Sequence, residues 1–331
     1  MLLRLIPEIY NIQNKKMLRV VFMGTPEFAV HSLDALVKAG INIVGVVTSP
    51  DKPAGRGLAL KLSDVKKYAE EHQLVILQPE KLKNPDFIQQ LRSLNPDLAV
   101  VVAFRMLPEE VWAMPTMGTI NLHASLLPQY RGAAPINWAI INGEKKTGVT
   151  TFFIEKEIDT GKIIAKHEVE ITDTDTAGSL HDKLAAIGAQ VLVDTVNKIK
   201  GGTCVPIAQE DMSLGIDLRP APKIFRENCR INWGSNLSDI NNFIRGLSPY
   251  PGAWTTLVKG GEVKTLKILE GQPADTLLGD TGQLISQGKT LLASCEKGSF
   301  QINKLQLEGK KPMLTDEFLR GIRDIDQYCI K

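Results

Sequence analysis

Residues 18–40 read LRVVFMGTPEFAVHSLDALVKAG, and this stretch decides the fold class. It opens with a nearly continuous apolar run, which is typical of a parallel strand buried on both faces. Gly24 then supplies a turn, Thr25 is a good helix N-cap, and Pro26 suits the first helical position. The apolar residues that follow recur at helical spacing until Gly40 closes the helix. The stretch therefore predicts a strand–turn–helix unit.

The same alternation continues along the first half of the chain. Apolar runs predict further strands at residues 41–47, 74–77, 98–103 and 118–122, with helical patterns between most of them. This order predicts an α/β fold with a doubly wound, mostly parallel sheet. Ligands of such sheets bind at the carboxyl ends of the strands. The first turn lacks the G-x-G-x-x-G pattern, so the sequence does not support NAD or FAD as a ligand.

The second half of the chain changes character. Two strands at 148–154 and 162–170 precede a long amphipathic helix at 176–200. A proline-containing stretch with few periodic apolar residues follows, and beyond it short β-like runs separated by glycines predict a small β-barrel. We therefore expect an N-terminal extension, a larger domain, a linker and a C-terminal domain, at residues 1–16, 17–204, 205–222 and 223–331.

Composition narrows the class of protein further. The 331 residues are 43% hydrophobic and 23% charged, which argues for about two globular domains and against disorder. The net charge is +2, but the segment 223–331 carries 15 basic and 12 acidic residues, the sign that a nucleic-acid-binding domain needs. Four widely spaced cysteines argue against a zinc site or a disulfide framework and favour a reducing compartment, the cytoplasm. No apolar run has the roughly 18 residues of a membrane span.

The N-terminal residues 1–16 contain an apolar stretch that is short and interrupted by Arg4, Pro7 and Glu8. It is too broken for the core of a signal peptide, and no small-residue cleavage site follows it. We hypothesise that Met17 is the true start or that the preceding segment is a frayed tail. The mass of the native protein distinguishes these possibilities.

Three segments carry residues that are suited to chemistry. Asn121 and His123 lie two apart at the end of a predicted strand, so they point to the same side of it. Asp159 opens an Asp-Thr-Gly turn between two strands, and a long loop at 48–62 contains Lys52 and Arg56. Taken alone, each segment has a plain structural explanation: a polar strand end, a common turn and a solvated loop. Long loops inside compact domains are nevertheless usually functional or disordered.

Together these segments resemble the methionyl-tRNA formyltransferase family. The matching stretches are MGTPEF at 23–28, PDKPAGRG at 50–57, NLHASLLP at 121–128, RGAAPI at 131–136, DTG at 159–161 and IRGLSPYPGA at 244–253. The resemblance extends from Met17 to the C-terminus. It implies a Rossmann-like catalytic domain of the formyltransferase fold, followed by a small OB-like β-barrel.

The resemblance also implies a reaction: transfer of the formyl group of 10-formyltetrahydrofolate to the amino group of methionyl initiator tRNA. Formyl transfer needs a free amine, a stabilised oxyanion and a path for a proton. By resemblance, Asn121 donates to the oxyanion, while His123 and Asp159 handle the proton. Which of the two is the general base stays open at this stage.

The resemblance assigns binding residues as well. The folate-binding turn is Ser125, Leu126, Leu127 and Pro128, and the tRNA-binding cations are Lys52, Arg56, Lys61 and Arg245. No metal is implied, because the remaining histidines show no ligand spacing.

Two other functions stay open at this stage. One is a folate-dependent formyltransferase that acts on a small amine. The other is a non-catalytic RNA-binding protein of the same shape, against which the presence of Asn121, His123 and Asp159 argues. We expect a monomer with no membrane partner.

Overall fold

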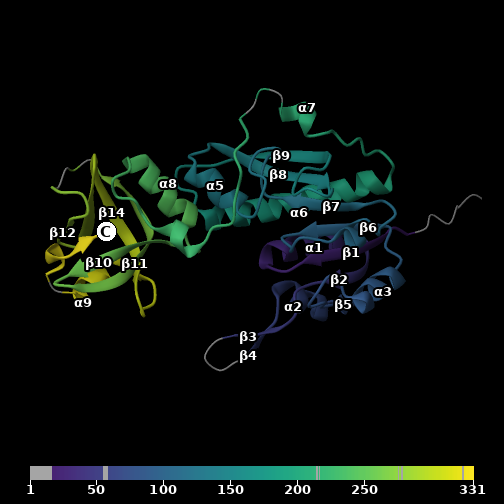
Figure 1. The fold of residues 1–331 in the computed structure, drawn as a ribbon, viewed down its shortest axis with the longest axis horizontal. Coiled ribbons are helices and arrows are strands. Elements are labelled where there is room, and N and C mark those ends of the chain that lie inside the picture. The colour runs from purple at the N-terminus through teal and green to yellow at the C-terminus, as the bar shows by residue number, and fades with distance from the viewer. Residues whose placement is uncertain are drawn as a thin grey trace, which may run out of the picture. The chain divides into compact units, whose positions relative to one another are not determined.

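The computed structural model describes residues 17–54, 59–213, 215, 217–274, 276, 279–322 and 324–331 (Figure 1). The expected extension at 1–16 lies outside this part of the chain. By packing, the chain divides into two compact units. Unit 1 comprises Met1–Asn121 and Val196–Cys204, and unit 2 comprises Leu122–Thr195 and Val205–Lys331. Each unit is described by itself below.

Unit 1 is built on parallel strands. Its strands are β1 (Arg19–Gly24), β2 (Asn42–Val47), β5 (Ile76–Leu77) and β6 (Leu98–Val102). Strand β1 pairs in parallel with β2 and with β6, and β2 pairs in parallel with β5. Most residues of β1 and all of β6 are buried, as their continuous apolar sequences predict.

The described helices of unit 1 differ in how they begin. They are α1 (Glu27–Lys38), α2 (Asp64–Glu71), α3 (Pro85–Ser93) and α4 (Glu109–Trp112). Side chains cap α2 and α3 but neither α1 nor α4. The Ser63 hydroxyl accepts from the backbone N–H of Lys66 and so caps α2. The predicted cap of α1 at Thr25 is wrong by one residue: Pro26 occupies that position and no side chain caps the helix.

Gly24 makes the turn from β1 into α1, as predicted. A Cβ atom added there would lie 2.6 Å from the Ala29 Cβ and 3.0 Å from the Val102 carbonyl oxygen. The strand and the helix therefore approach too closely for any other residue to fit without movement.

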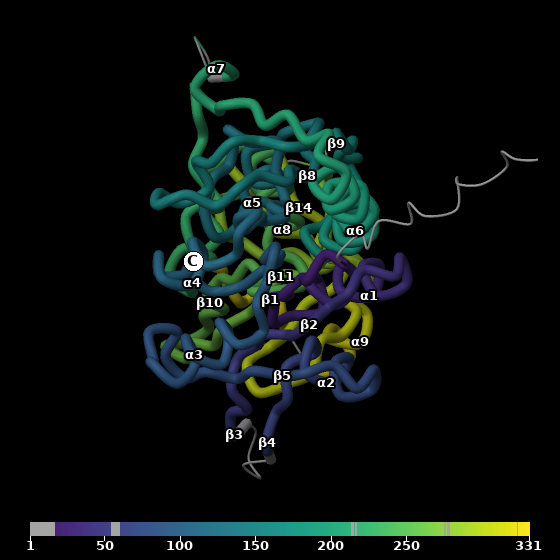
Figure 2. The backbone as a smooth tube through the Cα atoms, turned by 90° about the vertical axis from the view of Figure 1, so that its right-hand side faces the viewer, coloured from purple at the N-terminus to yellow at the C-terminus, as the bar shows by residue number. Residues whose placement is uncertain are grey.

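The loop expected at 48–62 contains a short antiparallel hairpin. Its strands are β3 (Lys52–Ala54) and β4 (Ala59–Lys61), which project from the rest of unit 1 (Figure 2). The pairing places Lys52 directly opposite Lys61. Two like charges at opposed positions raise the local positive potential of the hairpin, at the cost of their mutual repulsion.

The sheet that contains the parallel strands of unit 1 has the order β5-β2-β1-β6-β7-β8-β9, with β7 (Thr119–His123), β8 (Lys146–Phe153) and β9 (Ile163–Glu170). Strands β8 and β9 pair antiparallel. The expectation of a mostly parallel, Rossmann-like sheet is confirmed. The long helix α6 (Ala177–Lys200) matches its predicted range within one residue, whereas the short helix α5 (Pro135–Ile141) was not predicted.

The stretch at 205–222 that the sequence predicts as a linker pairs with two other parts of unit 2. Ile207 forms a β-bridge with Ile163, and Ala221 forms one with Gly132. The stretch also contains the short helix α7 (Glu210–Ser213). It therefore contributes backbone hydrogen bonds to the folded unit.

The C-terminal part of unit 2 is a curled antiparallel sheet (Figure 1). Its strands are β10 (Ala253–Lys259), β11 (Glu262–Ala274), β12 (Leu284–Gln287), β13 (Thr290–Cys295), β14 (Gly298–Leu307), β15 (Met313–Leu314) and β16 (Cys329–Ile330). Helix α8 (Leu237–Leu247) buries Ile240 and Ile244 in the same hydrophobic core as Phe300. Helix α9 (Thr315–Gly321) contributes Phe318 to this core. The expectation of an OB-like domain is confirmed.

Candidate active site

His123 lies at the end of β7 with 7% of its side chain exposed. Its Nε2 is 2.9 Å from the carbonyl oxygen of Tyr130. A carbonyl can only accept, so Nε2 carries a proton and donates it. The other nitrogen, Nδ1, is then the basic one.

Asp159 faces that basic nitrogen from the loop between β8 and β9. Its Oδ2 lies 3.7 Å from Nδ1 of His123, and 12% of the side chain is exposed. The same oxygen accepts from the backbone N–H of Gly132 at 2.9 Å. The structure therefore brings two predicted catalytic residues together, although they are far apart in the sequence.

Asn121 is two residues before His123 on β7 and is partly buried. Strand alternation directs both side chains to the same side. An amide there supplies N–H donors, which suit a developing oxyanion.

The loop that carries Asp159 has an unfavourable backbone conformation, which the surrounding residues must stabilise. Asp159 has φ +55°, in the left-handed region that is costly for residues with a Cβ. A Cβ at Gly161 would overlap the carbonyl oxygen of Phe153, so only glycine fits there.

Gln209 and Arg131 were missed as candidate site residues. The Gln209 side chain is fully buried and donates to the carbonyl oxygens of Asp159 and Gly161, at 2.9 and 2.8 Å. Arg131 donates to Gln209 Oε1 through Nε and Nη2, at 3.1 and 2.7 Å. No spacing pattern marks Gln209, because it stands alone in the stretch predicted as a linker.

The predicted folate-binding turn is tied to β8 by hydrogen bonds. Thr150 Oγ1 donates to the Ser125 carbonyl oxygen at 2.7 Å and lies 3.1 Å from the Leu127 nitrogen, from which it accepts. The Ser125 hydroxyl donates to the carbonyl oxygen of Gln129 at 2.6 Å. These bonds fix the shape of the turn.

Burial within the turn is uneven. Leu127 is fully buried and packs with Phe152 and Ile163, and Pro128 is buried too, whereas Leu126 is partly exposed. Lys166 donates to the Leu127 carbonyl oxygen at 3.0 Å, and burial lowers the pKa of this lysine. The Leu127 side chain thus belongs to the core, and Leu126 is the member of the turn with an accessible side chain.

Sequence comparison shows which family the chain matches. The formyl transferase profile matches residues 18–196, and the profile of the formyl transferase C-terminal domain matches residues 223–323. The methionyl-tRNA formyltransferase of Bacteroides thetaiotaomicron is 54% identical over 319 residues, which cover 95% of this chain and 98% of the relative. The chain belongs to the methionyl-tRNA formyltransferase family. The family's member in Flavobacterium johnsoniae is 50% identical over 94% of this chain and 98% of its own length.

Solved structures show the same fold at much lower identity. HypX from Aquifex aeolicus in complex with tetrahydrofolic acid superposes with a TM-score of 0.63 at 17% identity, over 92% of this chain and 47% of HypX. An N-formyltransferase from Helicobacter canadensis, in complex with folinic acid and dTDP-3-aminofucose, gives a TM-score of 0.60 at 20% identity. The latter match covers 86% of this chain and 98% of that one.

Members of the methionyl-tRNA formyltransferase family act on tRNA, a polyanion, so exposed lysines and arginines are candidates for phosphate contacts. Lys52 and Lys61 are exposed on the β3–β4 hairpin. Arg56, which lies between these two lysines in the sequence, is outside the described residues. The two lysines thus meet the geometric requirement for phosphate contacts.

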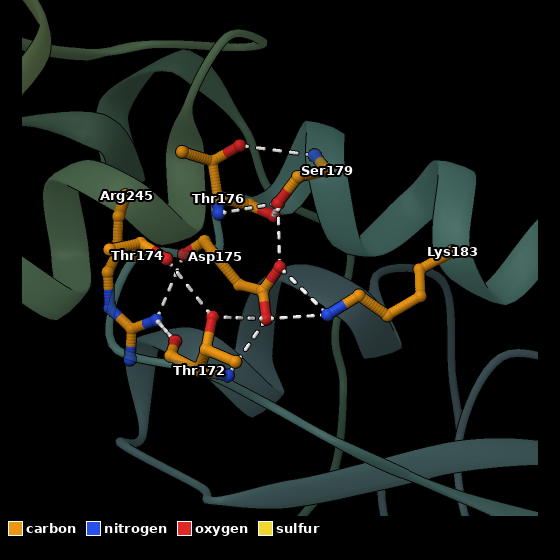
Figure 3. A network of polar contacts seen from close by, with 7 residues as sticks. All are labelled: Thr172, Thr174, Asp175, Thr176, Ser179, Lys183 and Arg245. Carbon is orange, nitrogen blue, oxygen red and sulfur yellow. Dashed lines mark hydrogen bonds and ion pairs between the residues drawn. The ribbon is translucent and has the colours of Figure 1, made fainter.

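Arg245, by contrast, is buried, with 8% exposed. Its Nη1 donates to the carbonyl oxygens of Asp175 and Thr172, at 2.9 and 3.1 Å, and burial lowers its pKa (Figure 3). The guanidinium holds α8 to the turn that precedes α6. The structure gives Arg245 this structural role, so we correct the prediction and leave it out of the tRNA-binding set.

A groove of about 640 Å³ in unit 2 combines cations with aromatic rings. Lys223, Arg226 and Lys267 line it together with Trp254 and Tyr250, whose side chain is 82% exposed. The Arg226 guanidinium lies 5.9 Å from the centre of the Trp254 ring. Such a surface suits a nucleic acid, whose phosphates need cations and whose bases stack on aromatic rings. We call it the basic groove.

The described residues show neither a metal-binding cluster nor a membrane-spanning helix. No group of three or more His, Cys, Asp or Glu side chains there is placed to hold a metal ion. None of the described helices has the length and apolar character to span a membrane.

Proposed function

We propose that the chain transfers the formyl group of 10-formyltetrahydrofolate to the amino group of methionyl initiator tRNA, which yields N-formylmethionyl-tRNA for translation initiation. One observation carries the site assignment: His123 and Asp159 lie 3.7 Å apart, in a chain that is 54% identical to a methionyl-tRNA formyltransferase. To take part in formyl transfer, this pair must lie beside the substrate amine and the formyl carbon that the amine attacks.

We assign each of the three side chains a step in the reaction. The free amine attacks the formyl carbon, and an Asn121 N–H stabilises the oxyanion that develops. The amine proton passes to the His123–Asp159 pair. Because Nε2 of His123 donates to the Tyr130 carbonyl, Nδ1 accepts the proton, and the Asp159 carboxylate 3.7 Å away stabilises the resulting positive charge. The tetrahedral intermediate then collapses, and N10 of the folate leaves with a proton from the same pair.

We assign binding to three surfaces. The Ser125–Pro128 turn lines the folate pocket, and the hydrogen bonds to Thr150 keep its shape. The acceptor arm of the tRNA contacts Lys52, Arg56 and Lys61, and its backbone contacts the basic groove. We further propose that the enzyme acts as a monomer in the cytoplasm.

A formylation assay tests the function. The purified chain is given 10-formyltetrahydrofolate with methionyl initiator tRNA, methionyl elongator tRNA or an amino sugar nucleotide. We expect formyl transfer to the initiator tRNA to be fastest, with Asp159→Asn as a control of strongly reduced but measurable turnover. Faster transfer to the amino sugar would identify a small-amine formyltransferase, and no transfer to any acceptor would indicate a non-catalytic protein.

A further inference from the structure

We propose that Gln209 and Arg131 are positioning residues that hold the Asp159 loop against His123 during formyl transfer. This inference rests on the proposed catalytic roles of Asp159 and His123. It gives a function to the stretch at 205–222, which the sequence predicts only as a linker.

The first argument is that the Gln209 amide is completely engaged. Its nitrogen donates to the carbonyl oxygens of Asp159 and Gly161, and its oxygen accepts twice from Arg131. The side chain has no exposed surface. A buried amide with both hydrogens and its oxygen bonded has one stable orientation.

The second argument is that the contacts close a ring around the Asp159 carboxylate. Arg131 is followed by Gly132, whose N–H donates to Asp159 Oδ2. Gln209 holds the backbone carbonyl of the same aspartate and is itself held by Arg131. Gly132 thus fixes the carboxylate of Asp159 directly, whereas Gln209 fixes its backbone and is held in turn by Arg131, the neighbour of Gly132.

The third argument is that the loop would not keep this shape by itself. Asp159 is in the left-handed region, at φ +55°. A residue stays in such a conformation only where its surroundings enforce it. Without Gln209, we expect the loop to relax and Oδ2 to move away from Nδ1 of His123. A displacement of about 1 Å is enough to lower turnover by about 100-fold.

Gln209→Met tests the proposal, because methionine keeps the volume and removes the hydrogen bonds. We expect kcat to fall by roughly 10- to 100-fold while KM for both substrates changes by less than about threefold. Gln209→Glu keeps an acceptor for Arg131 but loses the donor to the two carbonyls, so it should be impaired as well. Gln301→Met is the matched control, since that amide bonds Asn303 in the C-terminal sheet.

A double-mutant cycle with Asp159→Asn separates positioning from a general structural role. If Gln209 acts through Asp159, adding Gln209→Met to Asp159→Asn lowers kcat by less than about threefold further. If the losses in kcat multiply, or if Gln209→Met raises KM and leaves kcat unchanged, the proposal is wrong. Near-normal turnover of Asp159→Asn alone would instead refute the catalytic role of Asp159. Arg131→Met provides the same cycle should the Gln209 variants not fold.

Discussion

Asn121 and His123 act on different atoms in the proposed reaction, so the loss of either side chain alone should lower turnover. We expect His123→Ala to lower kcat by about 10²- to 10⁴-fold, because the proton acceptor is removed. Asn121→Ala should lower kcat by about 10²- to 10³-fold, because one oxyanion donor is lost. Single-turnover formylation at saturating tRNA measures both, and a filter-binding assay should show little change in tRNA affinity.

The control for these variants is His181→Ala, which removes a partly exposed imidazole of α6, next to Asp182. It should retain full turnover. Near-normal kcat in His123→Ala or Asn121→Ala would remove that residue from the mechanism.

Gly161 allows a steric prediction at the same scale. In Gly161→Ala the new methyl group overlaps the Phe153 carbonyl oxygen, so the Asp159 loop must shift. We expect a loss of about 1–3 kcal/mol in the free energy of unfolding, together with a drop in kcat. Urea unfolding and formylation measure the two effects. Gly321→Ala is the control, because no atom lies near its added Cβ; equal destabilisation of both variants would contradict the prediction.

The β3–β4 hairpin is the element with the clearest expected effect on tRNA binding. Lys52→Ala and Lys61→Ala should each weaken binding several-fold and reduce the slope of log K against log salt by roughly 0.7–0.9, if each lysine contacts one phosphate. Turnover at saturating tRNA should not change. Lys83→Ala, at another exposed lysine of unit 1, serves as the control. Unchanged salt slopes in both hairpin variants would exclude these lysines from the interface.

Elements with long apolar runs or capping signals were predictable from the sequence. Strand β1 and helix α6 lie within one or two residues of their predicted ranges. The hairpin was not predicted, because three-residue strands contain too few positions for a period of two to be recognised. Helix α5 was missed because its seven residues span only two turns.

The candidate site shows the same division. Asn121 and His123 were accessible to prediction because both end an apolar strand. Asp159 could be identified only by family resemblance, because its separation of 36 residues from His123 in the sequence does not show whether the two lie close in space. Gln209 was out of reach, because its role arises only from the tertiary path of the 205–222 stretch. The prediction for Arg245 was wrong for a related reason. The sequence of a helix does not show whether a single arginine is exposed to solvent or bonded to buried carbonyl groups.

At the scale of the whole molecule, acid stability should depend on Asp175. Burial raises the pKa of this carboxyl, but hydrogen bonds from Lys183 and Thr172 outweigh it and lower the pKa to about 2 (Figure 3). Because the folded pKa lies below the ordinary value of 3.8, the stabilisation is present above pH 4 and is lost as the pH falls towards 2. With partial screening, we estimate about 1–2 kcal/mol.

Urea unfolding between pH 2 and 7 checks this expectation. Asp175→Asn should be less stable than the parent at pH 7 and should lose less stability between pH 4 and 2. Asp182→Asn, at a carboxylate that is 82% exposed, is the control. A parent-like pH dependence in Asp175→Asn would show that other carboxylates govern acid unfolding.

The chain path through residues 205–222 has a consequence for how this enzyme can be divided. The segment between the two family profiles supplies the bridge at Ala221 and the buried amide of Gln209. A cut within this segment would separate His123 and Asp159 from Gln209, which holds the Asp159 loop, even where both halves fold. Fragment complementation, circular permutation and domain exchange with relatives must therefore keep this segment with the N-terminal half.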